Sequence, residues 1–358
     1  MDKPTVQDIF HRFYPAYLDQ YSPSPVQAKV AHNIMNCKTG AYGANVCVCE
    51  DCGFVQIHYN SCRNRCCPMC QAVPKEMWMD ARREDVLDAP YFHLVFTVPD
   101  ILNPVIYSNQ RLLYDALYHA ASSTISELTA DPKHLGAKVG YICILHTWGS
   151  EMNFHPHIHT VLLGGGLASN NQWRDNGENF FLPIRVISKV FRGKYLEELK
   201  RLWEEDKLVF HGTAEKLRNH YAFKELLDSC YGMDWIPHCK KTFNGAQTVI
   251  KYLGKYTHRI AVSNHRIVRM DDDTVTFLVK DYRNEGQWKE LTISGVEFVR
   301  RFLMHVPPRR FVRIRHYGLL CSRTKSQKLT LCRNLLGCKK YLSKLRDMEM
   351  PEILEHLY

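Results

Sequence analysis

Three histidines occupy every second position of the stretch HPHIH, at His155, His157 and His159. Successive side chains of a β-strand point to opposite faces, so a strand here would place the three imidazoles on one face. Neutral imidazoles grouped in this way suit a divalent metal ion. A single histidine would more often be a hydrogen-bonded core residue, but three at a spacing of two favour metal binding. The sequence therefore predicts a metal site on this strand.

Tyr252 and Tyr256 lie four residues apart in YLGKYTHR, which would place them on one face of a helix. On spacing alone, an aromatic pair packed into the core is the commoner arrangement. A tyrosine hydroxyl has a pKa of about 10 and attacks phosphate poorly without help. A metal ion that polarises the phosphate would supply that help, as would neighbouring cations such as Lys255 and Arg259. The tyrosines are therefore candidate nucleophiles for phosphoryl transfer.

The chain has 14 cysteines, and eight of them lie between residues 37 and 70. The stretch CEDC contributes Cys49 and Cys52, and the stretch CPMC contributes Cys67 and Cys70. Each C-x-x-C turn offers two thiolates, and two such turns at this separation are typical of a tetrahedral four-thiolate zinc site. These four cysteines are therefore predicted to bind one structural zinc ion.

The same region could hold a second zinc ion. Its candidate ligands are Cys37, Cys62 and Cys66, with His58 as a plausible fourth and Cys47 as the competitor. The spacing does not choose between these two residues. The six cysteines beyond residue 140 are scattered, and we expect them to be small buried apolar residues.

Composition limits the class of protein. The chain has 358 residues, 45% of them hydrophobic and 23% charged, as in ordinary globular proteins. Lys and Arg number 47 against 37 Asp and Glu, and this net charge of +10 favours an acidic partner such as nucleic acid or an anionic membrane. The N-terminus does not resemble a secretory signal, and no apolar run could span a membrane. We therefore expect a soluble cytoplasmic protein.

The stretch from Phe298 to Leu345 contains no Asp or Glu but many Arg and Lys, with aromatic residues between them. This pattern is typical of a surface that binds a phosphate backbone and stacks bases. The alternative is a solvated basic face, which the lack of acids makes the weaker interpretation. With Lys255 and Arg259, the predicted DNA contacts are Arg309, Arg310, Arg313 and Arg315.

The period of the apolar pattern predicts the elements that position these residues. Strands are predicted at 91–99, 140–149 and 154–166, helices at 110–130, within 185–230 and at 246–259, a hairpin at 266–283, and a strand and helix within 286–306. This order predicts an α+β fold with a mostly antiparallel central sheet flanked by helices. Three regions are expected: a helical and zinc-binding domain at 1–90, a domain at 91–298 with a helical insertion at about 176–240, and a basic DNA-binding segment at 299–358.

Several of these motifs together resemble a known family. His157-Ile158-His159 resembles the His-hydrophobic-His signature of HUH endonucleases. The stretches FHLVFTVP, LHTWG, NFHPHIHTVLLGGGL, YLGKYTHRIAVSNHRI and EFVRRFLMHVPPRRFVRIRHYGLL resemble the two-tyrosine transposases of the insertion-sequence-91 family, and YNSCRNRCCPMCQ resembles their N-terminal zinc-binding domain. The resemblance covers roughly residues 30–335. It implies an HUH endonuclease domain preceded by a small zinc-binding domain.

The resemblance also implies a mechanism, rolling-circle transposition on single-stranded DNA. His157 and His159 would bind Mg²⁺ or Mn²⁺, and Tyr252 and Tyr256 would form 5′-phosphotyrosine links. The partners would be single-stranded DNA of the transposon ends and target, with the host replication machinery as a further candidate. A third metal ligand is usual in HUH enzymes; His155 is the first choice, and the alternatives are His93 and Gln247.

Two departures and two rival functions accompany the resemblance. Cys66 stands where family members usually have histidine, a change that keeps a zinc-ligand type. The C-terminus lacks the further cysteine pair of some relatives, so no third zinc is expected. A replication initiator or relaxase would share the histidines and tyrosines. A non-enzymatic zinc-dependent DNA-binding protein would explain only the cysteines and the charge.

Overall fold

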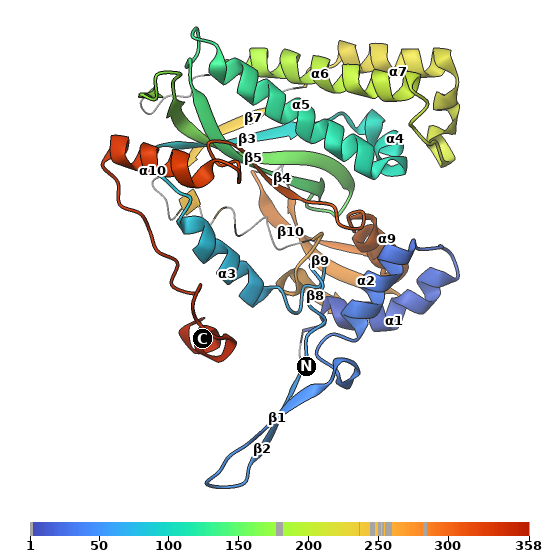
Figure 1. Ribbon diagram of the computed structural model, residues 1–358. Coiled ribbons are helices and arrows are strands. Elements are labelled where there is room, and N and C mark those ends of the chain that lie inside the picture. Colours follow the sequence, from blue (N-terminus) through green and yellow to red (C-terminus); the bar gives the residue numbers. More distant parts are fainter. Residues whose placement is uncertain are drawn as a thin grey trace. The chain divides into compact units, whose positions relative to one another are not determined.

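The computed structural model describes residues 3–176, 182–235, 237–243, 248–249, 252, 254, 260–281 and 285–357, and the side chains of 240–243 and 351 are not described (Figure 1). The chain forms two compact units, neither of them a continuous stretch. The first combines Met1–Glu76, Thr147–Phe154 and His258–Arg309; the second combines Met77–His146, His155–Thr257 and Arg310–Tyr358. The three consecutive regions expected from the sequence therefore differ from the compact units, because segments far apart in the chain share a core.

The first unit packs three helices with a three-stranded antiparallel sheet. The helices are α1 (Val6–Leu18), α2 (Pro25–Met35) and α9 (Gly295–Met304), and the sheet has the order β10 (Gln287–Ser294), β9 (Thr274–Asp281), β8 (Ile267–Met270). Capping boxes begin α1 at Thr5 and α2 at Ser24, where each side chain accepts a backbone N–H of the first turn. A Cβ at Gly295 would lie 2.2 Å from Phe13 Cγ, so only glycine allows α9 to start this close to α1. A one-turn helix, η4 (Asn264–Arg266), precedes β8.

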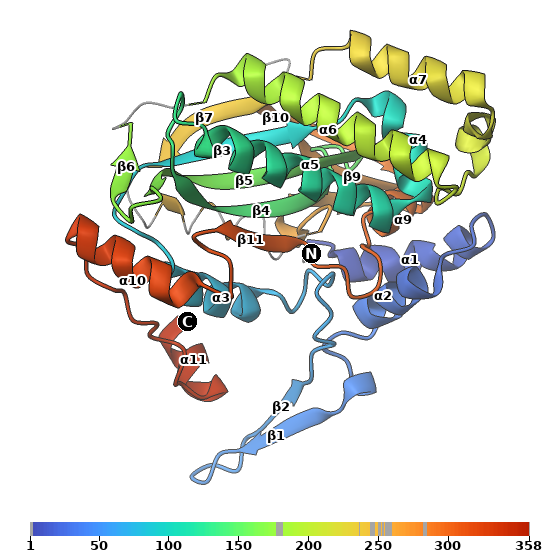
Figure 2. The same cartoon turned by 45° about the horizontal axis from the view of Figure 1, so that its top comes forward.

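A separate hairpin in this unit joins β1 (Ala44–Val48) to β2 (Val55–Tyr59), after the short helix η1 (Gly40–Tyr42). Every residue of both strands is exposed. Figures 1 and 2 both show this hairpin extending away from α1 and α2. It is a two-stranded ribbon that the described part of the chain leaves uncovered on both faces.

The second unit is built on a larger sheet, whose strands lie side by side in Figure 2. Their order is β11 (Ile314–Gly318), β4 (Lys138–Trp148), β5 (Phe154–Leu167), β3 (Tyr91–Thr97), β7 (His238–Phe243), and β6 (Trp173–Asp175) pairs with β5. The pairings of β11 with β4, of β5 with β3 and of β3 with β7 are antiparallel. The expectation of a mostly antiparallel α+β fold is confirmed.

Helices cover both faces of this sheet. One face packs against α5 (Gln110–Ala130) and α6 (Ile184–Glu204), for example through Phe96 and Phe191, whose rings are 4.9 Å apart. On the other face, Met79 of α3 (Ala72–Arg83) and Leu329 of α10 (Lys325–Leu336) share an apolar core with sheet residues such as Val161. The remaining helices are η2 (Asp100–Leu102), α4 (Asn103–Ser108), η3 (Gly212–Arg218), α7 (His220–Gly232) and α11 (Met350–Leu357).

The predicted strands, the 110–130 helix, the helices within 185–230 and the 266–283 hairpin are all confirmed, within one or two residues at most ends. Most of the helix predicted at 246–259 lies outside the described residues, although Thr248, Val249, Tyr252 and Gly254 have helical backbone. None of the helices in the described ranges combines the length and the apolar character needed to cross a membrane.

Candidate functional site

Three buried histidines converge on one face of the larger sheet. The ligand nitrogens of His146, His157 and His159 all lie within 4.8 Å of one another. The Nε2 atoms of His157 and His159 are 3.0 Å apart, and the His146 ring centroid lies 4.5 Å from that of His159. Each side chain is less than a tenth exposed. The cluster can therefore offer three imidazole nitrogens to one ion.

Strand alternation explains why these three meet. On β5, His157 and His159 share a face with Val161, and on β4, His146 continues the row of Ile142 and Ile144. The isoleucines and Val161 belong to the apolar core under α3 and α10. Sequence reasoning missed His146, although its signal was present: in YICILHTWG it is the next alternate residue after two isoleucines.

Burial favours the neutral form of His157 and His159, the form that binds metal ions. Burial lowers the pKa of His157 to about 4, and it lowers the pKa of His159 well below the ordinary value, with His146 and His157 adding to the effect. His157 Nδ1 is 2.7 Å from the carbonyl oxygen of His155, which therefore accepts its proton. That bond leaves Nε2 of His157 as the metal-binding atom.

Tyr252 approaches the same cluster from the far side of His159. Its hydroxyl oxygen is 3.2 Å from His159 Nδ1 and hydrogen-bonds to His93 Nε2. His93 Nε2 is in turn 2.9 Å from His159 Nδ1. The register of β3 on β5 causes this, because His93 pairs with Val161 and so shares the face of His159. Burial, with a smaller effect of His238, lowers the pKa of His93 to about 4.

The other residues predicted for this site lie outside the three-histidine cluster or outside the described residues. His155 lies at the start of the row, but its Nδ1 is 3.2 Å from an Asp100 oxygen and its side chain is 38% exposed. Nε2 of His93 lies next to Nδ1 of His159. The Nε2 atom of His159, on the other side of its ring, faces His157. Gln247 and Tyr256 lie outside the described residues, as do Lys255 and Arg259.

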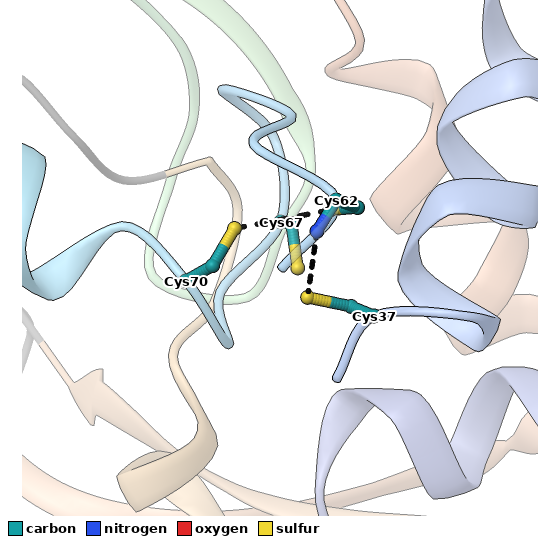
Figure 3. A group of neighbouring side chains, drawn as sticks. All are labelled: Cys37, Cys62, Cys67 and Cys70. Carbon is teal, nitrogen blue, oxygen red and sulfur yellow. Dashed lines mark hydrogen bonds between the residues drawn. The ribbon is translucent and has the colours of Figure 1, made fainter. Parts of the chain in front are cut away.

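Four cysteines of the first unit form a second candidate metal centre. The sulfurs of Cys37, Cys62, Cys67 and Cys70 lie within 4.8 Å of one another, and Figure 3 shows them pointing toward a common centre. The sulfurs of Cys62 and Cys70 are 3.8 Å apart. Four sulfurs at 2.3 Å from a tetrahedral zinc ion would be separated by about 3.8 Å, so the group fits zinc without rearrangement.

The electrostatics of this cluster call for a cation. The pKa of the Cys67 thiol is raised far above its ordinary value. The causes, largest first, are the hydrogen bond with the Cys62 sulfur, the hydrogen bond with the Cys70 sulfur, and burial. Four thiolates this close would repel one another, and a divalent ion removes that cost. Backbone N–H groups of Cys62 and Asn64 already point at the sulfurs of Cys37 and Cys62, each at 3.5 Å.

The structure groups the cysteines differently from the sequence prediction. Cys67 and Cys70 are brought together with Cys37 and Cys62, whereas Cys49 and Cys52 are exposed at the tip of the β1–β2 hairpin. The spacing identified the C-x-x-C turns correctly as local features, but the hairpin carries one turn away from the other. The residues expected at the second site are also dispersed: Cys66 packs in the apolar core of the first unit, and Cys47 and His58 are exposed on the hairpin.

The basic C-terminal segment has acidic partners elsewhere in the chain. Arg315 forms an ion pair with Asp115, and its guanidinium lies 4.0 Å from the centre of the Tyr118 ring. Arg315 therefore has partners within the protein, and its contact with DNA stays a prediction. Arg309 and Arg310 are exposed, and Arg313 is partly buried.

Asp80 of helix α3, and Glu84 and Asp85 in the turn after it, are acidic partners of the C-terminal segment. Lys325 is 2.8 Å from Asp85, and Arg346 is 2.5 Å from Glu84. Asp80 accepts hydrogen bonds from the Tyr341 and Ser343 hydroxyls and from the Leu345 backbone. The absence of acids between Phe298 and Leu345 therefore reflects, in part, packing against Asp80 and Asp85, which lie far away in the sequence.

Comparisons with known proteins agree with this geometry. A family described as "Putative transposase" matches residues 140–328, and one described as "Transposase zinc-binding domain" matches residues 9–98. The chain is 43% identical over 336 residues to "Putative transposase y4qJ" of Sinorhizobium fredii (strain NBRC 101917 / NGR234), covering 93% of this chain and 84% of the relative. It is 30% identical over 309 residues to "Transposase for insertion sequence element IS801" of Pseudomonas savastanoi pv. phaseolicola, covering 85% and 72%.

Among solved structures, a metal-bound conjugative relaxase TrwC in complex with OriT DNA matches 46% of this chain and 70% of its own, at 15% identity and a TM-score of 0.26. Such a low TM-score supports no conclusion about this chain. The assignment to a family therefore rests on the two sequence relatives and the two family matches.

Proposed function

This chain belongs to the transposase family that matches residues 140–328, with a transposase zinc-binding domain at residues 9–98, and from that premise we propose that it cuts and joins single-stranded DNA through tyrosine–phosphate bonds. The observation that supports this most directly is the position of the Tyr252 hydroxyl. It contacts His159, one of three buried imidazoles that converge on a single point. The proposed nucleophile therefore lies beside the proposed metal centre.

We propose that His146, His157 and His159 hold the catalytic ion. The 3.0 Å between two of the Nε2 atoms is close to the spacing of adjacent ligands around an octahedral ion at about 2.1 Å. An all-imidazole donor set favours Mn²⁺ over Mg²⁺, because Mg²⁺ prefers oxygen ligands. The ion would neutralise charge that builds on the phosphate oxygens in the transition state.

The histidine contacts then fix where the protons lie. With His159 binding through Nε2, its Nδ1 carries a proton, which it can donate to the Tyr252 oxygen at 3.2 Å. His93 Nε2 then keeps its single lone pair for the Tyr252 hydroxyl, which donates to it. This arrangement turns a lone pair of the tyrosine oxygen outward and gives the leaving proton a place to go.

In the proposed cleavage step, the Tyr252 oxygen forms a bond to a DNA phosphorus and the bond from that phosphorus to the 3′-oxygen breaks. The tyrosine proton passes to His93 Nε2, and the departing 3′-oxygen takes up a proton as it becomes a 3′-hydroxyl. The products are a 5′-phosphotyrosine link and a free 3′-hydroxyl, which attacks the link in the reverse step to join strands. Tyr256, four residues on in the sequence, would hold a second strand.

The four-cysteine cluster has a structural role in this proposal. Zinc at Cys37, Cys62, Cys67 and Cys70 would tie residues between α2 and α3 into one fold, because the ligands come from three separate turns. The domain would then present its surface to the ends of the insertion sequence, with Arg309 and Arg310 as exposed basic residues in reach of phosphate.

A direct test incubates the protein with labelled single-stranded DNA carrying the element's ends, in Mn²⁺ or Mg²⁺, and detects covalent protein–DNA adducts under denaturing conditions. We expect an adduct with wild type and none with Tyr252→Phe/Tyr256→Phe or His157→Ala. A Tyr317→Phe variant serves as a matched control, since this residue lies on the opposite sheet face, stacked on Tyr141. An adduct that survives in the double tyrosine variant would refute the proposal.

A replication initiator or relaxase would use the same chemistry, but the sequence relatives are transposases. A non-enzymatic DNA-binding protein would leave the contact between Tyr252 and the histidine cluster without a role.

A further inference from the structure

The tip of the β1–β2 hairpin carries a pair of cysteines that the proposed function does not use. Cys49 and Cys52 flank a tight turn that is closed by hydrogen bonds from Cys49 N to Phe54 O and from Gly53 N to Cys49 O, both 2.9 Å. Gly53 has a φ of +70°, which suits glycine. A tight C-x-x-C turn is the local unit that supplies two of the four thiolates of a zinc site.

This turn is too far from the four-cysteine cluster to share its ion. The base of the hairpin is tied beside Cys37 by a hydrogen bond from Lys38 N to Asn60 O. From Ala44 to Cys49 the ladder extends about 17 Å, at about 3.3 Å per residue. Sulfurs on one zinc ion lie about 3.8 Å apart. The buried cluster is also complete with four sulfurs of its own.

The turn also lacks further ligands in its own hairpin. In the described part of the chain, two groups of three or more potential ligand side chains come within 4.8 Å of one another, and neither contains Cys49 or Cys52. Cys47 shares the face of Cys49, but side chains two residues apart on a strand start about 6.7 Å apart. In this structure the sulfurs of Cys47, Cys49 and Cys52 do not all lie within 4.8 Å of one another. His58 is further down the ladder, opposite Asn45.

We propose that Cys49 and Cys52 form half of a zinc site that is completed by the same two cysteines of a second copy of this chain. Each tip supplies two sulfurs, and two tips supply the tetrahedral set of four that zinc prefers. The thiol protons pass to solvent as the ion binds. This link between two transposase chains is independent of the tyrosine chemistry, and the zinc-bridged tips join the chains end to end.

The surroundings of the tip fit a second copy better than DNA. There is no Lys or Arg between Lys38 and Arg63, and the turn itself contains Glu50 and Asp51, which would repel phosphate. Beside the turn, Phe54 and Val48 are 65% and 59% exposed. Apposed tips would cover part of this apolar surface, but the four thiolates carry more negative charge than the zinc ion neutralises, so the acidic residues of the two tips still repel one another. Because like charges face each other, association should strengthen as ionic strength rises.

The test compares full-length wild type with Cys49→Ser/Cys52→Ser under reducing conditions, by light scattering for mass and by metal analysis for zinc. We expect a zinc-dependent wild-type dimer and a monomeric variant, with wild type holding about half a zinc ion per chain more than the variant. The difference between the two proteins cancels zinc bound anywhere else. Since both cysteines are exposed, the variant should keep its fold, which circular dichroism verifies. Cys47→Ser/His58→Ala is the matched control and should behave as wild type.

Three results would overturn the proposal. A monomeric wild type with about one zinc ion per chain more than the variant would mean that the hairpin completes its own site, and the Cys47→Ser/His58→Ala control would then lose that ion. Equal zinc content in wild type and variant would mean that the turn binds no ion. A dimer that persists in the Cys49→Ser/Cys52→Ser variant would place the interface elsewhere.

Discussion

Replacing His146 with alanine is expected to weaken Mn²⁺ binding about 100-fold or more. Loss of a residue that only orients a metal ligand typically costs 10- to 100-fold in affinity, and loss of a ligand should cost no less, which is about 3 kcal/mol. Among the described residues, His146 is one of three ligand-type side chains in its cluster, and it is 4% exposed. The sequence alone favoured His155 for this role.

His155→Ala is the matched comparison. Its ring meets Asp100 at 3.2 Å in a pair whose side chains are 38% and 78% exposed, and such surface pairs contribute about 0–1 kcal/mol. We therefore expect its Mn²⁺ affinity to stay within about threefold of wild type, since the ring would have no part in binding the ion.

Isothermal titration of metal-free protein with Mn²⁺ measures both variants. His146→Gln accompanies the alanine variant because it keeps a polar side chain of similar size, and thermal unfolding without metal checks that the fold survives. The assignment of His146 would be refuted if His155→Ala lost most of the affinity while both His146 variants kept it.

Three further predictions concern the zinc cluster, the buried histidines and the C-terminal segment. Cys67→Ser should remove the zinc of the buried cluster and unfold the N-terminal region, whereas Cys321→Ser should leave zinc content unchanged by metal analysis. Burial lowers the pKa of His305 from 6.5 to about 4, so on acidification the unfolded chain takes up this proton before the folded one does. The free energy of unfolding should therefore be fully present above about pH 6.5 and fall by up to about 3 kcal/mol as the pH drops through 4. Denaturant unfolding at several pH values should show this slope reduced in His305→Gln. Asp80→Ala should leave three donors of residues 341–345 unpaired, which costs about 1–3 kcal/mol each when they stay buried, and limited proteolysis should then cut that segment first.

Strand periodicity in the sequence was enough to place His157 and His159 on one buried face. It could not choose the third ligand, because that choice depends on which strand lies beside β5. The order β11-β4-β5-β3 puts His146 on one side of the pair and His93 on the other. A pattern along one strand does not contain this information.

The cysteine turns show a similar limit. Spacing identifies each C-x-x-C turn, because a turn is a local structure of four residues. It does not say which turns meet, since the ladder from Ala44↔Tyr59 to Val48↔Val55 carries Cys49 and Cys52 away from Cys67 and Cys70. Cys37 could be assigned to the buried cluster only once the fold was known.

The basic segment shows a third limit, and its binding to DNA stays a prediction. Its lack of acids is real in sequence, but Asp85 and Glu84 reach Lys325 and Arg346 from more than 200 positions away. Local charge counts cannot include partners from a distant part of the chain. Charge runs of this kind predict nucleic-acid binding only after such internal ion pairs are subtracted.

The central claim is that Tyr252 is a nucleophile toward DNA phosphate. Mass spectrometry of the protease-digested protein–DNA adduct tests it most directly, because it identifies the residue that carries the nucleotide. The structure predicts nucleotide phosphate on the peptide containing Tyr252, formed only when the metal is present. Nucleotide attached solely to a residue outside the Tyr252–Tyr256 pair, or an adduct that forms equally well in chelator, would contradict the account.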